Sequence, residues 1–231
     1  GCIAYNWRRR IPLPQRNYFE TKWMVKNILE GHGPLCARYE ASSSRRFRSE
    51  GDSPAFMHQI LVGLRSLEHP AYGGWGGRFK PHRWGNNIWA GASDDGSIDK
   101  PIWRWAIAFQ NDWAARADWC VTKDYKKSNH PPKVKLAGSL DRTARPGEKI
   151  SLSAAGSSDP DGNKLTCKWW RYDDVDTAKT KIEITGADKV DASFVVPDEP
   201  GKTIHIILEI TDDGDPPLTR SARVIVKVAG K

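Results

Sequence analysis

The sequence predicts two modules: a Trp-rich, mainly helical one over residues 1–128 and an all-β sandwich over residues 129–231. Nine of the eleven tryptophans lie before residue 120. Apolar residues in the first part recur at the spacing of a helix, whereas beyond residue 165 they alternate as in a strand. A polar segment from 123 to 133 separates the two patterns. Its double proline favours an extended chain, and we place the module boundary there.

Three helices are expected in the first module, over residues 17–30, 54–67 and 102–119. Asn17 and Glu20 form a capping-box pattern, while Ser53 and Pro54 suit the cap and first turn of the second helix. In the third helix, aromatic and small residues three or four apart share one face. The Gly- and aromatic-rich segment 69–96 is predicted to be a long ordered loop. A loop of this length usually packs on something or binds something.

The second module is predicted to hold about seven short strands separated by turn clusters such as 159–162 and 213–216. Leu165, Cys167 and Trp169 alternate with polar residues, as do the apolar residues of 204–210. This spacing is typical of an immunoglobulin-like sandwich. Trp169 is then expected between the sheets, and Trp170 on the opposite face.

An acidic turn in this module has a superficial likeness to a calcium-binding loop. Asp159 and Asp161 alternate with other residues, but glycine occupies the fourth position and no glutamate the twelfth, so the EF-hand pattern fails. A polar turn between strands is the preferred interpretation. A calcium site at the sandwich edge, using both residues and Asp212, is the alternative.

The four cysteines are Cys2, Cys36, Cys120 and Cys167. They form no CxxC pair, so the sequence does not indicate a zinc site. One disulfide among the first three is possible, and the sequence does not choose the pairing. Cys167 lies in a predicted strand and is expected to be a small buried hydrophobic residue.

The net charge of +8 and the pI near 9.3 are compatible with binding to nucleic acid or to an anionic surface. The positive residues are mostly spread out, with local clusters at 8–10 and 45–48. Solvated loops are the preferred interpretation, because no nucleic-acid motif accompanies the charge. Binding to nucleic acid would weaken steeply with salt, which distinguishes it from sugar binding. No apolar run is long enough to span a bilayer, and no membrane partner is expected.

Several motifs stand out, at 31–35, 50–56, 63–64, 68–79, 109–116, 129–132, 157–162, 169–170, 204–209, 211–214 and 216–220. Together they resemble the motifs of a cellulose-binding, nucleoside-hydrolase-like family of bacterial and fungal proteins. The resemblance covers nearly the whole chain, and its Gly-Trp-Gly-Gly block at 74–77 is specific. It implies an α/β nucleoside-hydrolase-like domain, present here as its C-terminal part, followed by the immunoglobulin-like domain. It also implies an extracellular protein whose partner is cellulose or a related polysaccharide.

The same resemblance assigns two acidic residues to a cleft. Asp52 resembles the late aspartate that helps hold a calcium ion in nucleoside hydrolases, and Glu50 is a candidate catalytic residue beside it. The early Asp-x-Asp cluster of those enzymes has no counterpart here, and calcium needs six to eight oxygen ligands. The chain is therefore expected to bind carbohydrate without catalysis. The alternative is a calcium-dependent hydrolase of N-glycosidic bonds when the complete domain is present.

The candidate carbohydrate site is in the Gly- and aromatic-rich segment. Flat rings of Trp75, Trp84 and Trp89 suit the apolar faces of pyranose units, and Arg78 and Asn86 could bond to hydroxyl groups. The competing interpretation is that these tryptophans seal the segment against the helices. The sequence does not decide between the two.

Overall fold

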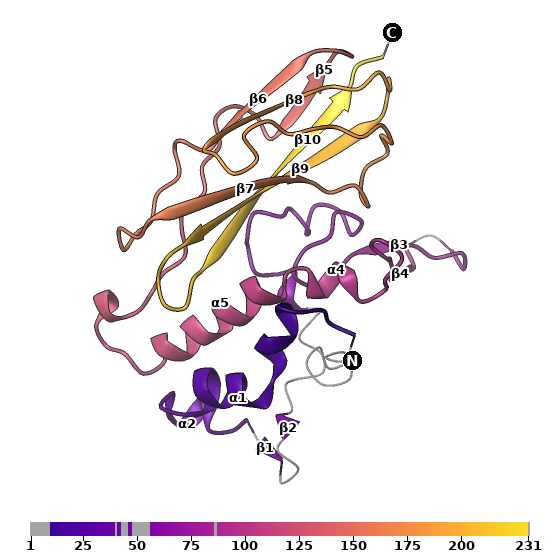
Figure 1. Ribbon diagram of the computed structural model, residues 1–231. Coiled ribbons are helices and arrows are strands. Elements are labelled where there is room, and N and C mark those ends of the chain that lie inside the picture. Colours follow the sequence, from indigo (N-terminus) through magenta and orange to yellow (C-terminus); the bar gives the residue numbers. More distant parts are fainter. Residues whose placement is uncertain (1–9, 40, 43–45, 48–55, 86, 231) are drawn as a thin grey trace. The chain divides into compact units, whose positions relative to one another are not determined.

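The computed structural model describes residues 10–39, 41–42, 46–47, 56–85 and 87–230 (Figure 1). The chain divides into two compact units. The first comprises Gly1–Leu61 and Ser66–Asn129, and the second comprises Val62–Arg65 and His130–Lys231. This division lies one residue from the expected boundary. The assignment of the short segment Val62–Arg65 to the second unit is a feature that the sequence patterns did not predict.

The first predicted helix is broken into short pieces of different pitch. It consists of the 3₁₀ turn η1 (Gln15–Phe19), the α-helix α1 (Thr21–Met24) and the π-helical η2 (Val25–Leu29), followed by α2 (Gly33–Cys36). The expected capping box is wrong. Asn17 lies inside η1, and Glu20 is extended, with φ −75° and ψ 142°, which interrupts the helix.

The second predicted helix is much shorter than expected. Within the described part of 54–67, only residues 56–57 are helical, and turns follow. Gly63 has a φ of +86°, in the left-handed region, which no α-helix can accommodate. The predicted helix over 102–119 is present, but it starts earlier and is divided into α4 (Lys100–Trp103) and α5 (Ala106–Trp119).

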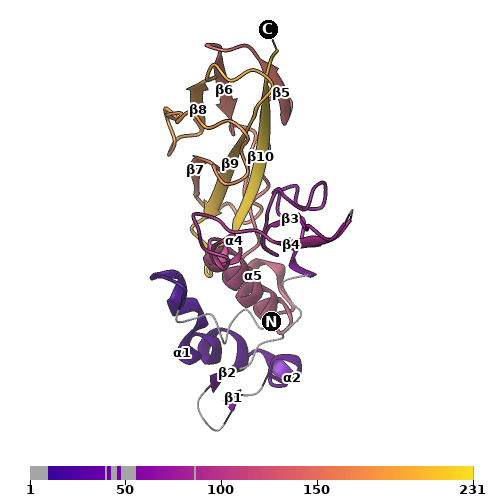
Figure 2. The ribbon, with the colours of Figure 1, turned by 90° about the vertical axis from the view of Figure 1, so that its right-hand side faces the viewer.

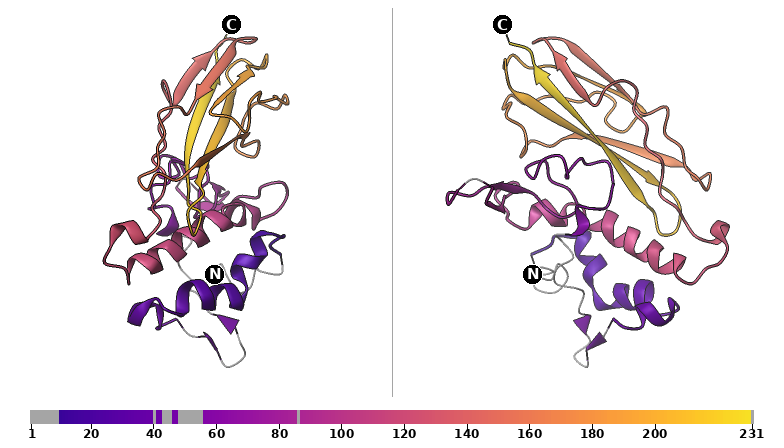
Figure 3. Two further views of the ribbon diagram at one scale, coloured as in Figure 1. Left: turned by 60° about the vertical axis from the view of Figure 1, so that its left-hand side comes forward. Right: turned by 180° about the vertical axis from the view of Figure 1, so that it is seen from behind.

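Helix α5 is the centre of the first unit. Both η1 and η2 contact it, and the views in Figure 3 show the indigo helices beside it. Trp105, Phe109 and Ala117 are buried as the apolar stripe predicts. Polar residues of α5 are buried as well, because neighbouring backbone satisfies them: Gln110 Nε2 donates to the carbonyl of Tyr18 at 2.7 Å. The 3₁₀ turn η3 (Tyr125–Lys127) follows the helix.

Two antiparallel pairs of short strands complete the described part of the first unit. Strands β1 (Ala41–Ser42) and β2 (Arg46–Phe47) form one pair. The other is a hairpin of β3 (Phe79–Pro81) and β4 (Trp89–Gly91), which lies within the segment expected to be a loop. The first unit is accordingly less helical than the sequence patterns indicated.

The second unit contains two sheets (Figure 2). One has the order β5-β10-β9-β7, and the other pairs β6 with β8. The strands are β5 (Asp141–Ala144), β6 (Lys149–Ser153), β7 (Leu165–Arg171), β8 (Asp191–Val195), β9 (Thr203–Asp212) and β10 (Thr219–Val228). Strand β5 runs parallel to β10, and the other pairs are antiparallel. Six strands are present in the described residues of this unit, against the roughly seven expected.

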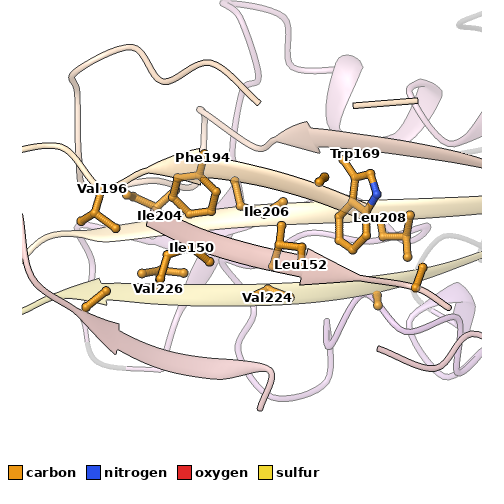
Figure 4. Close-up of a cluster of buried hydrophobic side chains, with 14 of the residues drawn as sticks. Ile150, Leu152, Trp169, Phe194, Val196, Ile204, Ile206, Leu208, Val224 and Val226 are labelled. Carbon is orange, nitrogen blue, oxygen red and sulfur yellow. The ribbon is translucent and has the colours of Figure 1, made fainter. Parts of the chain in front are cut away.

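Alternating apolar residues from both sheets form the core of the second unit (Figure 4). Trp169 is buried there, and its indole N–H donates to the carbonyl of Lys189 at 2.9 Å. Trp170 is half-buried on the other face of β7, where its Nε1 donates to Glu209 Oε1 at 3.2 Å. Both tryptophan predictions are confirmed. Cys167 is only partly buried, and it packs against the edge of the same cluster.

Residues Val62–Arg65, here called the clip, pack on β10. The N–H of Ser221 donates to the carbonyl of Val62 at 2.8 Å, and Arg223 Nε donates to the carbonyl of Leu64 at 2.7 Å. A Cβ added at Gly63 would lie 1.8 Å from the carbonyl oxygen of Ser221. The clip thus requires glycine both for its backbone conformation and for this close approach.

The clip also gives a fully buried arginine its partners. The side chain of Arg223 is 0% exposed, and its Nη1 donates to His205 Nδ1 at 3.1 Å. Its guanidinium lies 5.5 Å from the ring centre of Tyr172. His205 is also buried, because this face of its strand carries Arg223 and the clip rather than water.

Candidate functional site

The β3–β4 hairpin presents two tryptophans at its far end. Lys80 pairs with Ala90 and Pro81 with Trp89, and the N–H of His82 donates to the carbonyl of Ile88 at 2.7 Å, which extends the ladder by one step. Beyond that bond the chain turns back. In Figures 1 and 3 the hairpin projects away from α4, so its tip is open to solvent within this unit.

Trp84 is the most exposed of the large aromatic side chains at this tip. Its side chain is 74% exposed, and its N–H donates to His82 Nδ1 at 3.2 Å. The imidazole of His82 meets the indole edge-on, with ring centres 4.5 Å apart and planes at 65°. The contact restricts the indole and leaves a flat apolar surface available to a ligand.

Trp89 lies on the returning strand and is 37% exposed. The ring of His69 packs perpendicular to it at 5.7 Å, and His69 also contacts Tyr72 at 5.3 Å. Each exposed indole is therefore held by its own histidine. The sequence pattern did not indicate either histidine, because the contact of each ring with its tryptophan depends on the folded hairpin.

Trp75 does not belong to this surface. It is 2% exposed and packs edge-on against Phe109 at 6.4 Å. Gly74 and Gly77 exchange backbone hydrogen bonds of 3.1 and 2.9 Å, and the turn that they make directs the indole inward. The specific Gly-Trp-Gly-Gly block is thus a core turn. Its tryptophan cannot stack on a sugar in this conformation.

Arg78 is likewise engaged within the protein. Its Nε donates to Asp94 Oδ1 at 2.7 Å, and its Nη2 donates to the carbonyl of Ser93 at 2.6 Å. Asp94 is 0% exposed and also pairs with Arg104 Nε at 3.4 Å. This buried triad fixes the base of the hairpin. The expected role of Arg78 in bonding to sugar hydroxyls is replaced by a supporting one.

A partly buried imidazole also packs against the start of the hairpin. The ring of His58 packs against that of Phe79, the first residue of β3, with centres 5.5 Å apart. Burial lowers the pKa of His58, because the charged form loses hydration. Burial of this ring at the base of the hairpin thus favours its neutral form.

Three predicted site residues, Glu50, Asp52 and Asn86, lie outside the described residues. Their proposed roles in catalysis, calcium binding and hydroxyl recognition remain predictions. Among the residues that the structure does describe, no group of three or more His, Cys, Asp or Glu side chains is arranged to hold a metal ion. The described helices also include none that is long and apolar enough to cross a membrane.

The acidic turn of the second unit uses its carboxylates to bind backbone. Asp159 Oδ1 accepts from the N–H groups of Asp161 and Asn163 at 2.9 and 3.1 Å. Asp161 accepts from the N–H of His130 at 2.6 Å, and Asp212 Oδ1 from that of Leu218 at 2.9 Å. These bonds agree with the preferred interpretation of a polar turn.

Two family models match the chain. Residues 3–79 match the nucleoside-hydrolase-like domain of cellulose-binding Sde182. Residues 149–228 match the C-terminal domain of the cellulose-binding protein Sde0182. The two exposed tryptophans of the hairpin lie between these matches. No curated protein matches the chain.

A solved structure is similar over nearly the whole chain. It is a nucleoside hydrolase-related hypothetical protein from Saccharophagus degradans that is associated with carbohydrate metabolism. The identity is 31%, the TM-score is 0.76, and the match covers 98% of this chain and 56% of that one. The present chain thus spans little more than half the length of that relative.

A weaker match is the solution structure of the PKD domain from KIAA 1837 protein. It has 18% identity and a TM-score of 0.31, and it covers 42% of this chain and 88% of that one. This likeness is too low to support an inference. From the two family models and the longer relative, the chain resembles the C-terminal part of cellulose-binding proteins that combine a nucleoside-hydrolase-like domain with their own C-terminal domain.

Proposed function

We propose that this chain binds carbohydrate, namely cellulose or a related polysaccharide, through the tip of the β3–β4 hairpin. The single observation that carries the proposal is the exposure of Trp84 and Trp89, each held by a histidine, in a chain similar to cellulose-binding proteins. Indole faces suit the C–H faces of pyranose rings, because both are flat and weakly hydrated. The platform consists of these two tryptophans, without Trp75.

The remaining parts of the proposal follow from the resemblance. The second unit is an immunoglobulin-like sandwich, the protein is extracellular, and the chain by itself is not a catalyst. Two exposed indoles on one hairpin also fit a polymer whose chains lie side by side better than a small soluble sugar. Binding is therefore expected to be strongest on insoluble cellulose.

The test is a binding isotherm of the full chain on insoluble cellulose, with Trp84→Ala and Trp89→Ala made singly and together. If each indole contributes about 0.5–1.5 kcal/mol, like an aromatic pair, the double variant should bind more weakly by roughly 5- to 150-fold. Tyr125→Ala is the matched control, because Tyr125 is an exposed aromatic residue outside the hairpin. Unchanged binding by a folded double variant would refute the platform.

Ionic strength provides a second discrimination. Stacking of indoles on sugar should be nearly insensitive to salt. Binding to a nucleic acid should instead weaken steeply from about 50 to about 500 mM salt, by roughly a factor of ten for each phosphate that the protein neutralises. Retention on cellulose at both salt concentrations supports the carbohydrate proposal. Retention that disappears at high salt favours the anionic alternative.

The second candidate is a calcium-dependent hydrolase of N-glycosidic bonds, favoured by the match of residues 3–79 to a nucleoside-hydrolase-like domain. In this proposal Asp52 is a calcium ligand and Glu50 a catalytic residue, and the other ligands come from an Asp-x-Asp cluster in a longer protein. Its test is Asp52→Ala in a protein that carries such a cluster. If both calcium affinity and nucleoside turnover persist, the assignment of Asp52 is wrong.

A further inference from the structure

Two cysteines of the first unit line one cavity. Cys36 closes α2, and Cys120 is the C-cap of α5, directly after its last residue. Both are reduced in this structure. They border a cavity of about 540 Å³, and its other lining residues are Leu35, Arg38, Tyr39, Trp113, Arg116 and Ala117. The carbohydrate proposal makes no use of this cavity or of either thiol.

The packing between α2 and α5 brings the thiols to the same place. Cys36 is buried in a cluster with Ala114 and Ala117 of α5. Residues three apart on a helix share a face, so Cys120 is the next position along the stripe that Ala117 occupies. Cys36 therefore packs against the row of α5 that ends in Cys120.

Two further contacts hold α2 against this end of α5. His32 Nε2 lies 2.9 Å from Asp118 Oδ1. A Cβ added at Gly33, the first residue of α2, would lie 3.0 Å from Val121 Cγ1. These contacts flank the two cysteines on both chain segments and hold them on the lining of the same cavity.

We propose that Cys36 and Cys120 form an intramolecular disulfide when the protein meets a disulfide oxidant. The bond would join α2 to the end of α5 across the wall of the cavity. It selects one pairing from the three that the sequence left open among Cys2, Cys36 and Cys120. The inference is independent of the proposed function, because none of the hairpin residues takes part.

Their different accessibility assigns the order of the reaction. Cys120 is exposed, whereas Cys36 is 6% exposed. Burial raises the pKa of Cys36, and the nearby Cys120 and Asp118 raise it further, so its thiol stays protonated up to a higher pH. Cys120 therefore reacts first with a small disulfide such as oxidised glutathione.

The exchange proceeds in two steps. The sulfur of Cys120 attacks one sulfur of the oxidant, a mixed disulfide forms, and one thiolate leaves. Cys36 then loses its proton, and its sulfur attacks Cys120 Sγ, which breaks the mixed disulfide and releases the second thiolate. Two cysteine thiols are oxidised, and one small disulfide is reduced to two thiols that take up the two protons.

Peptide mapping tests the pairing directly. Trypsin places the four cysteines in four different peptides, 1–8, 27–38, 117–123 and 165–168. The full chain is incubated with oxidised glutathione, alkylated, digested and analysed without reduction. The expected product is peptide 27–38 linked to 117–123. It should be absent from Cys120→Ser, whose exposed site should tolerate the change, and it should persist in Cys2→Ser and Cys167→Ser.

Thermal unfolding adds a second readout. The bond would close a long loop, and on the entropy model it should raise the Tm of the oxidised protein by on the order of 10 °C over the reduced one. Cys120→Ser should lose that difference. The proposal is overturned if peptide 1–8 is linked to either cysteine, or if Cys120 is recovered only as its mixed disulfide with glutathione. It is also overturned if both thiols stay free during the incubation and are recovered alkylated.

Discussion

At the scale of the single residue, Gly63 is a position where the structure strictly requires glycine. Its φ of +86° favours glycine, and a side chain there would collide with the carbonyl of Ser221. Gly147, in the same unit, has a φ of +79° with nothing within 4 Å of an added Cβ. The two positions share a positive φ, and they differ in the space available to an added Cβ.

We therefore expect Gly63→Ala to destabilise the second unit more than Gly147→Ala does. The control should cost about 1–2 kcal/mol, as expected for a left-handed alanine. Gly63→Ala should cost that amount plus a collision, about 3 kcal/mol or more in total. Urea unfolding of both variants measures the difference. Equal midpoints would mean that the clip moves away from β10 without cost.

Asp176 is a second residue with an unusual environment. Its carboxylate is buried, accepts from the N–H of His205 at 2.6 Å and pairs with Arg171. Burial raises its pKa to about 6, although the bonds to Arg171 and to the His205 N–H oppose that rise. Between pH 3.8 and 6 the folded state therefore binds more protons at this group than the unfolded state does.

This difference gives the expected pH dependence its sign. The free energy of unfolding should fall as pH rises from about 4 to 6, by up to about 3 kcal/mol for this group. Asp176→Asn should abolish that component and keep an acceptor for the His205 N–H. Denaturation of both proteins across this range isolates the component as their difference. A wild-type curve that rises relative to the variant would show that Arg171 dominates instead.

At the scale of the element, the hairpin depends on its buried base. Asp94→Asn should leave Arg78 and Arg104 facing a neutral amide, and breaking such a buried pair costs about 3–5 kcal/mol. The matched control is Asp95→Asn: that carboxylate is exposed and pairs with Lys100 at 3.2 Å, a contact worth about 0–1 kcal/mol. Hydrogen exchange at the Ala92 N–H, which bonds to Arg78, reports on the hairpin. Similar exchange in both variants would contradict this support.

The elements of the second unit could be predicted from sequence, and those of the first largely could not. Strands β9 and β10 follow a period of two over ten residues, which a single apolar core enforces. The expected helix over 54–67 had a good cap and apolar spacing, but its last residues bind to β10 through a left-handed glycine. Such a tertiary contact leaves no local signal. Periodicity also could not separate Trp75 from Trp84, because both lie in a segment without a regular period.

At the scale of the whole molecule, the clip makes the second unit discontinuous in sequence. A fragment of residues 130–231 would lack the carbonyl of Leu64 and leave the buried guanidinium of Arg223 without that bond. We expect this fragment to unfold at a lower urea concentration than the second unit within the full chain. Its free energy of unfolding should be lower by about 2–4 kcal/mol. Hydrogen exchange at the backbone amides of β10, followed in both proteins at increasing urea concentration, measures the loss. Identical midpoints would show that the clip contributes no stability.

The clip also sets how many times the backbone passes between the two units. The chain leaves the first unit after Leu61, returns at Ser66 and leaves again after Asn129. A protease that cut the polar segment 123–133 would produce two fragments that stay joined, because the N-terminal fragment still carries the piece that seats on β10. The halves would co-elute after such a nick and separate only in denaturant, whereas a sandwich on a simple tether would be released at once.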